Sequence, residues 1–162
     1  MDIAHGYAAV LTTPLGKLGI STCETGVTGL SFLSPETPDF IATTPLAKKV
    51  SSQLQAYFIN PQMDFDLPML SEGTSFQKKV WQALRTIPSG TTLTYGALAQ
   101  QLKTSPRAIG GACRSNPLPI FIPCHRIVSQ QGLGGYSGSV EGPNLDIKSW
   151  LLCHEGYSIK HG

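Results

Sequence analysis

Residues 94–114 read TYGALAQQLKTSPRAIGGACR, and this stretch decides the fold of the second half of the chain. Thr94 is a suitable N-cap, and the apolar residues after it recur at the three- and four-residue spacing of a short helix. A break follows at 103–105. Ser105 and Pro106 then begin another helix, expected over Arg107 to about Ser115. Two short helices with so short a break predict a helix-turn-helix.

The second of these helices has an unusual composition. Arg107 and Arg114 flank the small-residue run Ala108-Ile109-Gly110-Gly111-Ala112. A glycine in the middle of a helix costs about 1 kcal/mol relative to alanine. A helix that tolerates two of them is expected to be approached closely, either by another helix or by a large partner.

Upstream, the sequence predicts one more helix and a small α+β domain. Thr74 and Gln77 fit a capping box that opens the helix. Before it we expect a linker at 61–73 with a short strand at Phe65–Leu67. Residues 1–70 are expected to form the N-terminal structural domain, and residues 71–162 the second domain. In the first domain we expect strands at Tyr7–Thr12, Leu18–Cys23 and Val27–Leu33, a loop at Ser34–Thr43, and a helix from Thr44 and Pro45 to Asn60.

The net charge of +2 over 162 residues is unevenly distributed: residues 1–70 carry −3 and residues 71–162 carry +5. Unless this asymmetry arose by chance, it indicates an anionic partner for the second half. No apolar run approaches the roughly 18 residues of a membrane span. The first ten residues also lack the basic stretch of a signal peptide. We expect a cytoplasmic protein, or a nuclear one in a eukaryote, with no membrane partner.

Four cysteines, at 23, 113, 124 and 153, include no CxxC pair, which argues against a zinc ribbon. In the cytoplasm they would be free thiols. We expect Cys113 and Cys153 in the core and Cys23 at the end of a strand. Cys124 is the thiol that the sequence places for chemistry.

Cys124 belongs to the segment IFIPCHRIV at 120–128. An apolar strand is expected at Ile120–Ile122, ended by the proline that follows. A thiol is nucleophilic as its thiolate, and His125 and Arg126 are groups that can lower its pKa. Side chains adjacent on a strand point to opposite faces, so Cys124 and His125 could need a bridging water or a third residue. The alternative interpretation is an ordinary buried cysteine.

From Phe76 to Gly156 the chain closely resembles the O6-alkylguanine-DNA alkyltransferases, also called methylated-DNA–protein-cysteine methyltransferases. The resemblance is weaker in the N-terminal part. It implies an α+β fold: a small ribonuclease-H-like N-terminal domain, then a winged helix-turn-helix-like alkyltransferase domain. The matching motifs in chain order are Phe76-Gln77, Val80-Trp81, Ile87-Pro88-Ser89-Gly90, Thr94-Tyr95, Arg107-Ala108-Ile109-Gly110, Asn116-Pro117, Pro123-Cys124-His125-Arg126, Gly135-Tyr136-Ser137-Gly138, Trp150-Leu151-Leu152 and His154-Glu155-Gly156.

The resemblance assigns the reaction to five residues. Cys124 would accept the alkyl group of O6-alkylguanine, and of O4-alkylthymine as a further substrate, in DNA. His125 would take the thiol proton through a water, and Glu155 would orient His125. Asn116 would brace the turn around the site. Tyr95 would contact the flipped nucleotide and donate a proton to the leaving base.

The resemblance also assigns a DNA-binding surface. Arg107 would fill the space left by the flipped nucleotide, and the small residues beside it would let the helix lie in the minor groove. Ser137 would hydrogen-bond near guanine O6, and the backbone at Ile127 would contact the base. The other residues assigned to this surface are Ala108, Gly110, Gly111 and Arg114.

The expected product is a thioether on Cys124, which does not hydrolyse, so the protein would be consumed in one transfer. The partner would be double-stranded DNA, bound by a monomer. No cofactor and no metal are expected, since His5 and Cys23 alone do not complete a zinc site. The other departures from the family pattern are a turn before Arg107 about two residues shorter, with Pro106 where a small residue is common, an apparent loop insertion at Glu141–Leu145, and Ser149 where glutamate is common.

Three other functions remain open at this point. A non-enzymatic binder of alkylated DNA would bind tightly and leave Cys124 unmodified. A winged-helix transcription regulator would read base edges, for which the glycine-rich helix offers few side chains. A Cys-His hydrolase would turn over repeatedly.

Overall fold

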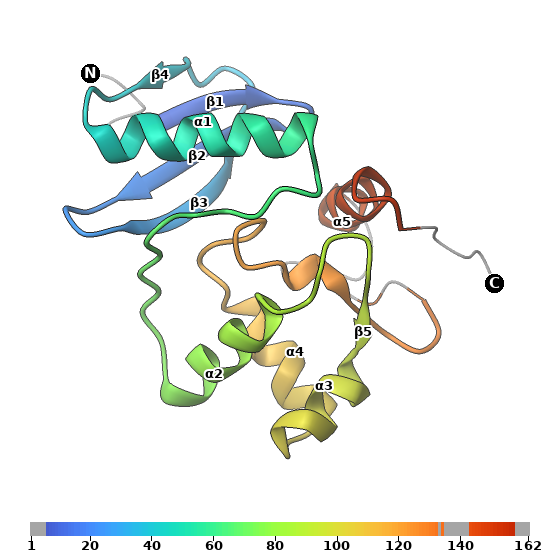
Figure 1. Ribbon diagram of the computed structural model, residues 1–162. Helices are drawn as coiled ribbons and strands as arrows, with labels where there is room; N and C mark the ends of the chain where they lie inside the picture. The colour runs from blue at the N-terminus through green and yellow to red at the C-terminus, as the bar shows by residue number, and fades with distance from the viewer. Residues whose placement is uncertain (1–5, 133, 135–142, 158–162) are drawn as a thin grey trace. The chain divides into compact units, whose positions relative to one another are not determined.

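The computed structural model describes residues 6–132, 134 and 143–157. The chain divides into two compact units, Met1–Ser71 and Glu72–Gly162 (Figure 1). No helix in the described part of the chain is long and apolar enough to cross a lipid bilayer.

The first unit contains an antiparallel four-stranded sheet in the order β3-β2-β1-β4. Ala9 pairs with Ile20 on one side and with Ile41 on the other, so β1 lies inside the sheet. The three predicted strands are confirmed, and the fourth lies in the predicted loop, where two residues give too short a pattern to detect. The bounds are β1 Ala9–Thr13, β2 Gly16–Thr22, β3 Val27–Leu33 and β4 Phe40–Ile41.

The helix α1, Pro45–Ile59, packs against this sheet (Figure 1). Its N-cap is Thr44, as predicted: the hydroxyl accepts a hydrogen bond from the Ala47 amide at 3.2 Å. The helix buries one side of its surface, formed by Ala47, Val50, Ser51, Leu54 and Tyr57.

The strand predicted at Phe65–Leu67 is wrong. The backbone of Asp66 is bonded instead to the side chain of Gln53 on α1, which accepts from its amide at 2.8 Å and donates to its carbonyl oxygen at 3.1 Å. The linker pairs with the sheet further along the chain, where Met69 forms an isolated β-bridge with Val27. The Gln53 side chain thus satisfies the Asp66 backbone amide and carbonyl groups, which a neighbouring strand would otherwise have bound.

In the second unit, α2 is Ser75–Leu84 and begins with the predicted capping box. Thr74 accepts from the Gln77 amide at 3.0 Å, and the Gln77 side chain accepts from the Thr74 amide at 2.9 Å. The Trp81 indole of this helix donates to the Ala112 carbonyl oxygen at 2.8 Å. This bond ties α2 to the glycine-rich helix.

The two short helices are confirmed as α3, Tyr95–Leu102, and α4, Pro106–Arg114. Thr94 and Ser105 cap them, each accepting from the amide three residues ahead. Between them, Lys103 adopts a left-handed conformation with φ 56°. This residue turns the chain within the three-residue break.

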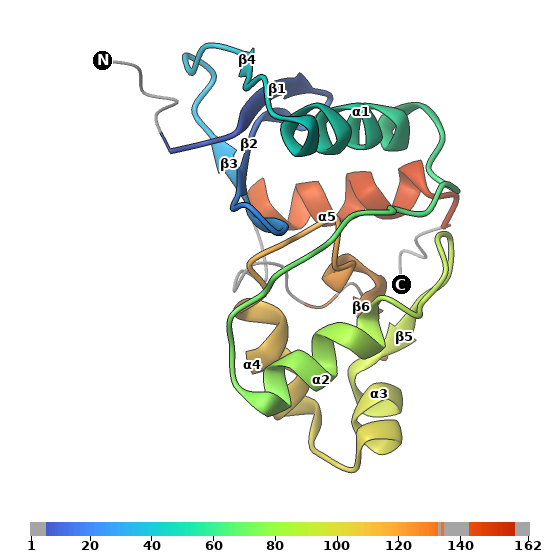
Figure 2. The ribbon, with the colours of Figure 1, turned by 60° about the vertical axis from the view of Figure 1, so that its left-hand side comes forward.

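The remaining elements form the support of the candidate site: β5 Leu93–Thr94, the 3-10 helix η1 Cys124–Arg126, β6 Ile127–Val128 and α5 Pro143–His154. β5 and β6 are parallel, and α5 packs on η1 (Figure 2). The expected loop insertion is corrected in part, because residues 143–145 begin α5. Glu141 and Gly142 lie outside the described residues.

Candidate active site

The Cys124 segment is a buried irregular turn, not the end of a strand. An isolated bridge joins Pro119 to Ile122, and the predicted strand over Ile120–Ile122 is absent from this described segment. Ile120 has φ 76°, which is strained for a β-branched residue. Its side chain is buried, so surrounding packing holds this conformation. The 3-10 helix begins directly at Cys124.

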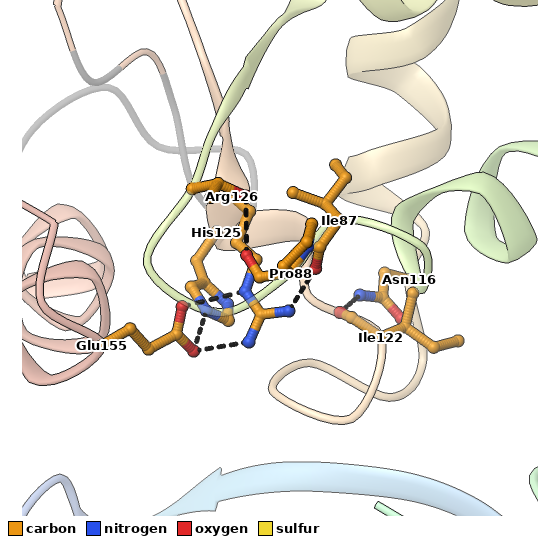
Figure 3. A network of polar contacts seen from close by, with 8 residues as sticks. Ile87, Pro88, Asn116, Ile122, His125, Arg126 and Glu155 are labelled. Carbon is orange, nitrogen blue, oxygen red and sulfur yellow. Dashed lines mark hydrogen bonds and ion pairs between the residues drawn. The ribbon is translucent and has the colours of Figure 1, made fainter. Parts of the chain in front are cut away.

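His125, the residue after Cys124, belongs to a polar network with Arg126 and Glu155 (Figure 3). Nε2 of His125 is 2.8 Å from Oε2 of Glu155. Arg126 donates through Nε to Oε1 of the same carboxylate at 2.8 Å and through Nη2 to Oε2 at 2.9 Å. Burial alone would raise the pKa of Glu155, but hydrogen bonds from His125 and Arg126 lower it to about 2. Glu155 is therefore an ionised carboxylate with two partners.

His125 is a neutral imidazole in this network. Burial lowers its pKa, and the hydrogen bond and charge of Glu155 oppose that shift only in part. Since an ionised carboxylate only accepts, Nε2 carries the hydrogen that is donated to Glu155. Nδ1 then holds the lone pair, and it is buried with no hydrogen-bond partner among the described residues. The nitrogen able to accept a proton is therefore Nδ1.

Cys124 is buried, and burial raises the pKa of its thiol. A hydrogen bond from Asn116 and the positive charge of Lys148 act in the opposite direction. The expectation that Arg126 favours the thiolate is wrong, because its guanidinium faces Glu155. Cys124 rests as a thiol and needs a base before it can act as a nucleophile.

Asn116 joins the two ends of the turn that precedes Cys124. Its Nδ2 donates to the Ile122 carbonyl oxygen at 2.9 Å, and its Oδ1 accepts from the Leu118 amide at 2.9 Å. The side chain is thereby fixed on the turn that leads to Cys124.

Sequence reasoning missed Lys148, which is fully buried on α5. Its Nζ donates to the Ile127 carbonyl oxygen at 2.6 Å and lies 6.0 Å from the centre of the Tyr95 ring. Burial lowers its pKa to about 8.

A sequence signal for Lys148 was available: Lys148 and Glu155 are seven residues apart and share the helical spacing of the apolar residues Leu151 and Leu152. Arg126, the second partner of Glu155, was also missed as a site residue.

The residues assigned to DNA lie on α4 and at the start of α3. Tyr95 is half-buried, and an added Cβ at Gly134, where φ is 73°, would lie 2.8 Å from its ring. Arg107 and Arg114 are exposed. The small residues of α4 that stay half-buried are Ala108, Gly110 and Gly111.

The two glycines of α4 are not required by packing within the described structure. A Cβ added at Gly110 would meet Tyr95 at 4.0 Å, and one at Gly111 would meet Arg114 at 4.0 Å. Both are ordinary van der Waals distances. The alternative that these glycines admit a neighbouring helix of this chain is therefore wrong.

Other expectations have mixed outcomes. Cys153 is exposed, contrary to the core position expected for it, and Cys113 is half-buried. Cys23 is exposed directly after β2. Ser137 lies outside the described residues, and so does His5. The absence of zinc stays a prediction.

Comparison with known proteins identifies the family. Residues 75–157 match the domain described as "6-O-methylguanine DNA methyltransferase, DNA binding domain". The methylated-DNA–protein-cysteine methyltransferase of Methanosarcina acetivorans is 37% identical, covering 93% of this chain and 98% of that protein. The constitutive Bacillus subtilis enzyme of the same name is 38% identical, covering 95% and 98%. The crystal structure of Mycobacterium tuberculosis OGT in complex with DNA superposes with a TM-score of 0.76 at 33% identity, covering 91% of each chain. With relatives this similar over nearly its whole length, the chain belongs to the 6-O-methylguanine DNA methyltransferase family.

Proposed function

We propose that this chain repairs DNA by transferring the alkyl group of O6-alkylguanine irreversibly to its own Cys124. The observation that carries the proposal is the buried pair of His125 and Glu155: His125 follows Cys124 directly on η1, and its Nε2 is 2.8 Å from the Glu155 carboxylate. The relatives from Methanosarcina acetivorans and Bacillus subtilis bear the name of this activity.

The chemistry is a single displacement. Cys124 passes its thiol proton through a water to Nδ1 of His125, and the thiolate attacks the alkyl carbon. A C–S bond forms while the bond from carbon to O6 breaks, and its electron pair leaves with guanine. Tyr95 donates a proton to the departing base. O4-alkylthymine presents the same type of alkyl carbon and is a second substrate of this displacement.

The thioether product is stable to hydrolysis, so each molecule acts once and needs no cofactor. The raised pKa of Cys124 supports the need for His125, since a thiol buried in this way does not ionise unaided.

The DNA partner is supported by α4. Arg107 is exposed at its beginning and Arg114 at its end, and the small residues between them permit close approach to a narrow groove. In the proposed complex the protein binds as a monomer, and α4 lies in the minor groove. Arg107 occupies the place of the flipped nucleotide. Residues 71–162 carry DNA binding and transfer, and residues 1–70 are a structural domain. The Mycobacterium tuberculosis relative has been solved with DNA.

Intact-mass measurement tests the proposal. The protein is mixed with a duplex that contains O6-methylguanine. We expect one methyl adduct on Cys124, absent from Cys124→Ala and retained in Cys153→Ala, which removes an exposed thiol instead. Tight binding with Cys124 unmodified would favour a lesion binder, and repeated turnover on esters would favour a hydrolase. Either result would contradict the proposal.

A further inference from the structure

Arg126 connects three parts of the site through one guanidinium. Nε and Nη2 hold both oxygens of Glu155, the residue directly after α5, at 2.8 and 2.9 Å, and Nη1 donates to the Ile87 carbonyl oxygen at 2.6 Å (Figure 3). A two-oxygen contact of this kind fixes the plane of a carboxylate. Oε2 is thereby held 2.8 Å from Nε2 of His125.

The turn that follows α2 restricts Glu155 from another side. Gly90 has φ 83°, and a Cβ added there would lie 2.8 Å from the Glu155 carbonyl oxygen. This close contact and the Arg126–Ile87 bond come from the same four-residue turn, 87–90. The backbone of Glu155 thus lies close to the same turn that binds the Arg126 guanidinium.

Arg126 also balances the charge that His125 experiences. Burial lowers the pKa of His125, Glu155 at the end of α5 raises it, and Arg126 and Lys148 lower it further. Cys124 is the neighbouring titratable group on η1. The charged side chains of α2, which also packs on η1, are Lys78 and Lys79, and both are exposed. Without Arg126, the carboxylate would face His125 alone and draw a proton onto it.

We propose that Arg126 is a positioning residue for alkyl transfer: it fixes Glu155 and keeps His125 neutral, so that Nδ1 can take the proton of Cys124. The inference rests on the proposed function, because a protonated His125 could not act as the base. Arg126 itself acts only through Glu155 and His125.

Direct titration of His125 by NMR tests this inference without DNA. In Arg126→Met, we expect the midpoint of His125 protonation to rise toward neutral pH. Arg126→Lys keeps the positive charge but cannot bind both oxygens of Glu155 as the guanidinium does. In this variant the His125 midpoint should remain closer to that of the wild type. Lys48→Met removes an exposed positive charge on α1 and should leave the midpoint unchanged. A midpoint in Arg126→Met equal to that of the wild type overturns the inference.

The double variant Arg126→Met/Glu155→Gln keeps the test decisive if the single variant does not fold, since it leaves no unpaired buried carboxylate. With both charges removed, the His125 midpoint should fall to the wild-type value or below it. A midpoint above the wild-type value in this double variant contradicts the electrostatic role.

The pH dependence of single-turnover methyl transfer provides the second measurement. Each unit by which the His125 midpoint rises above the assay pH reduces the fraction of neutral base about tenfold. Arg126→Met should therefore lose transfer at pH values below its raised His125 midpoint and regain it at alkaline pH. An equal loss at every pH would overturn the inference. Failure of the wild type to transfer at all would refute the proposed function instead, while the NMR titration would still decide the role of Arg126.

Discussion

At the scale of single residues, Lys148 is a fully buried lysine on α5. Its ammonium group is fully buried, and electrostatic attraction links it to Cys124 and Cys113. Burial disfavours the charged form of a lysine, so Lys148 releases its proton more readily than an exposed lysine does. When Lys148 is charged, it favours the thiolate form of Cys124.

The buried lysine predicts a specific pH dependence of stability. The folded protein releases the Lys148 proton near pH 8, whereas the unfolded chain retains it to about pH 10.5. Between these values unfolding takes up a proton, so wild-type stability rises with pH relative to Lys148→Met. From pH 7 to about pH 9.5 the relative gain is about 2 kcal/mol. Urea unfolding of both proteins at the two pH values measures it, and a constant difference between them would contradict the prediction.

At the scale of elements, the sequence predicts helix starts far better than the backbone of the reactive turn. Thr74, Thr94 and Ser105 all cap the helices assigned to them, because a cap depends on a hydroxyl and on amides only three residues away. The segment at Ile120–Ile122 is apolar and reads as a strand. Apolar character indicates burial but does not distinguish a strand from an irregular buried turn. That turn is determined by contacts such as those of Asn116, which sequence periodicity does not reveal.

The same limit applies to the candidate site. Cys124 and His125 are detectable because they are adjacent in the sequence. The contacts of Glu155 with His125 and Arg126 span about 30 residues and form only when α5 packs on η1. The resemblance supplied the partnership of His125 with Glu155, and nothing local indicated that Arg126 shares the carboxylate.

The glycines of α4 predict opposite effects on stability and on DNA binding. Gly110→Ala and Gly111→Ala should each stabilise the protein by about 1 kcal/mol, because alanine is the better helix former and the added methyl group fits. If α4 enters a groove, the same methyl groups should weaken binding to duplex DNA by about tenfold, or ~1.4 kcal/mol.

Gly96→Ala is the matched control for this pair, since Gly96 is also helical and its added Cβ would meet Thr94 at 4.0 Å. It should give a similar gain in stability with unchanged affinity. Thermal unfolding and fluorescence anisotropy measure the two quantities. Full DNA affinity in the stabilised Gly110 and Gly111 variants would argue against close approach of α4 to DNA.

At the scale of the whole molecule, the charge difference between the two parts of the sequence gives a means to locate DNA binding. Residues 1–70 carry −3 and residues 71–162 carry +5. Each positive side chain that neutralises a phosphate releases a counterion, so binding weakens as salt increases. The salt dependence therefore reports how many charges contact DNA, whatever the lesion and whatever the chemistry at Cys124.

A comparison of two doubly substituted proteins then shows which positively charged residues contact DNA. Arg107→Gln/Arg114→Gln and Lys48→Gln/Lys49→Gln each remove two positive charges, from α4 and α1 respectively. On lesion-free duplex DNA, the slope of log affinity against log salt should decrease in magnitude by about 2 in the α4 variant, at roughly 0.9 per phosphate contact. The α1 variant has the same net charge, so an equal loss in both would mean that overall charge, and not the surface of α4, determines DNA binding. An unchanged slope in the α4 variant would remove Arg107 and Arg114 from the DNA interface.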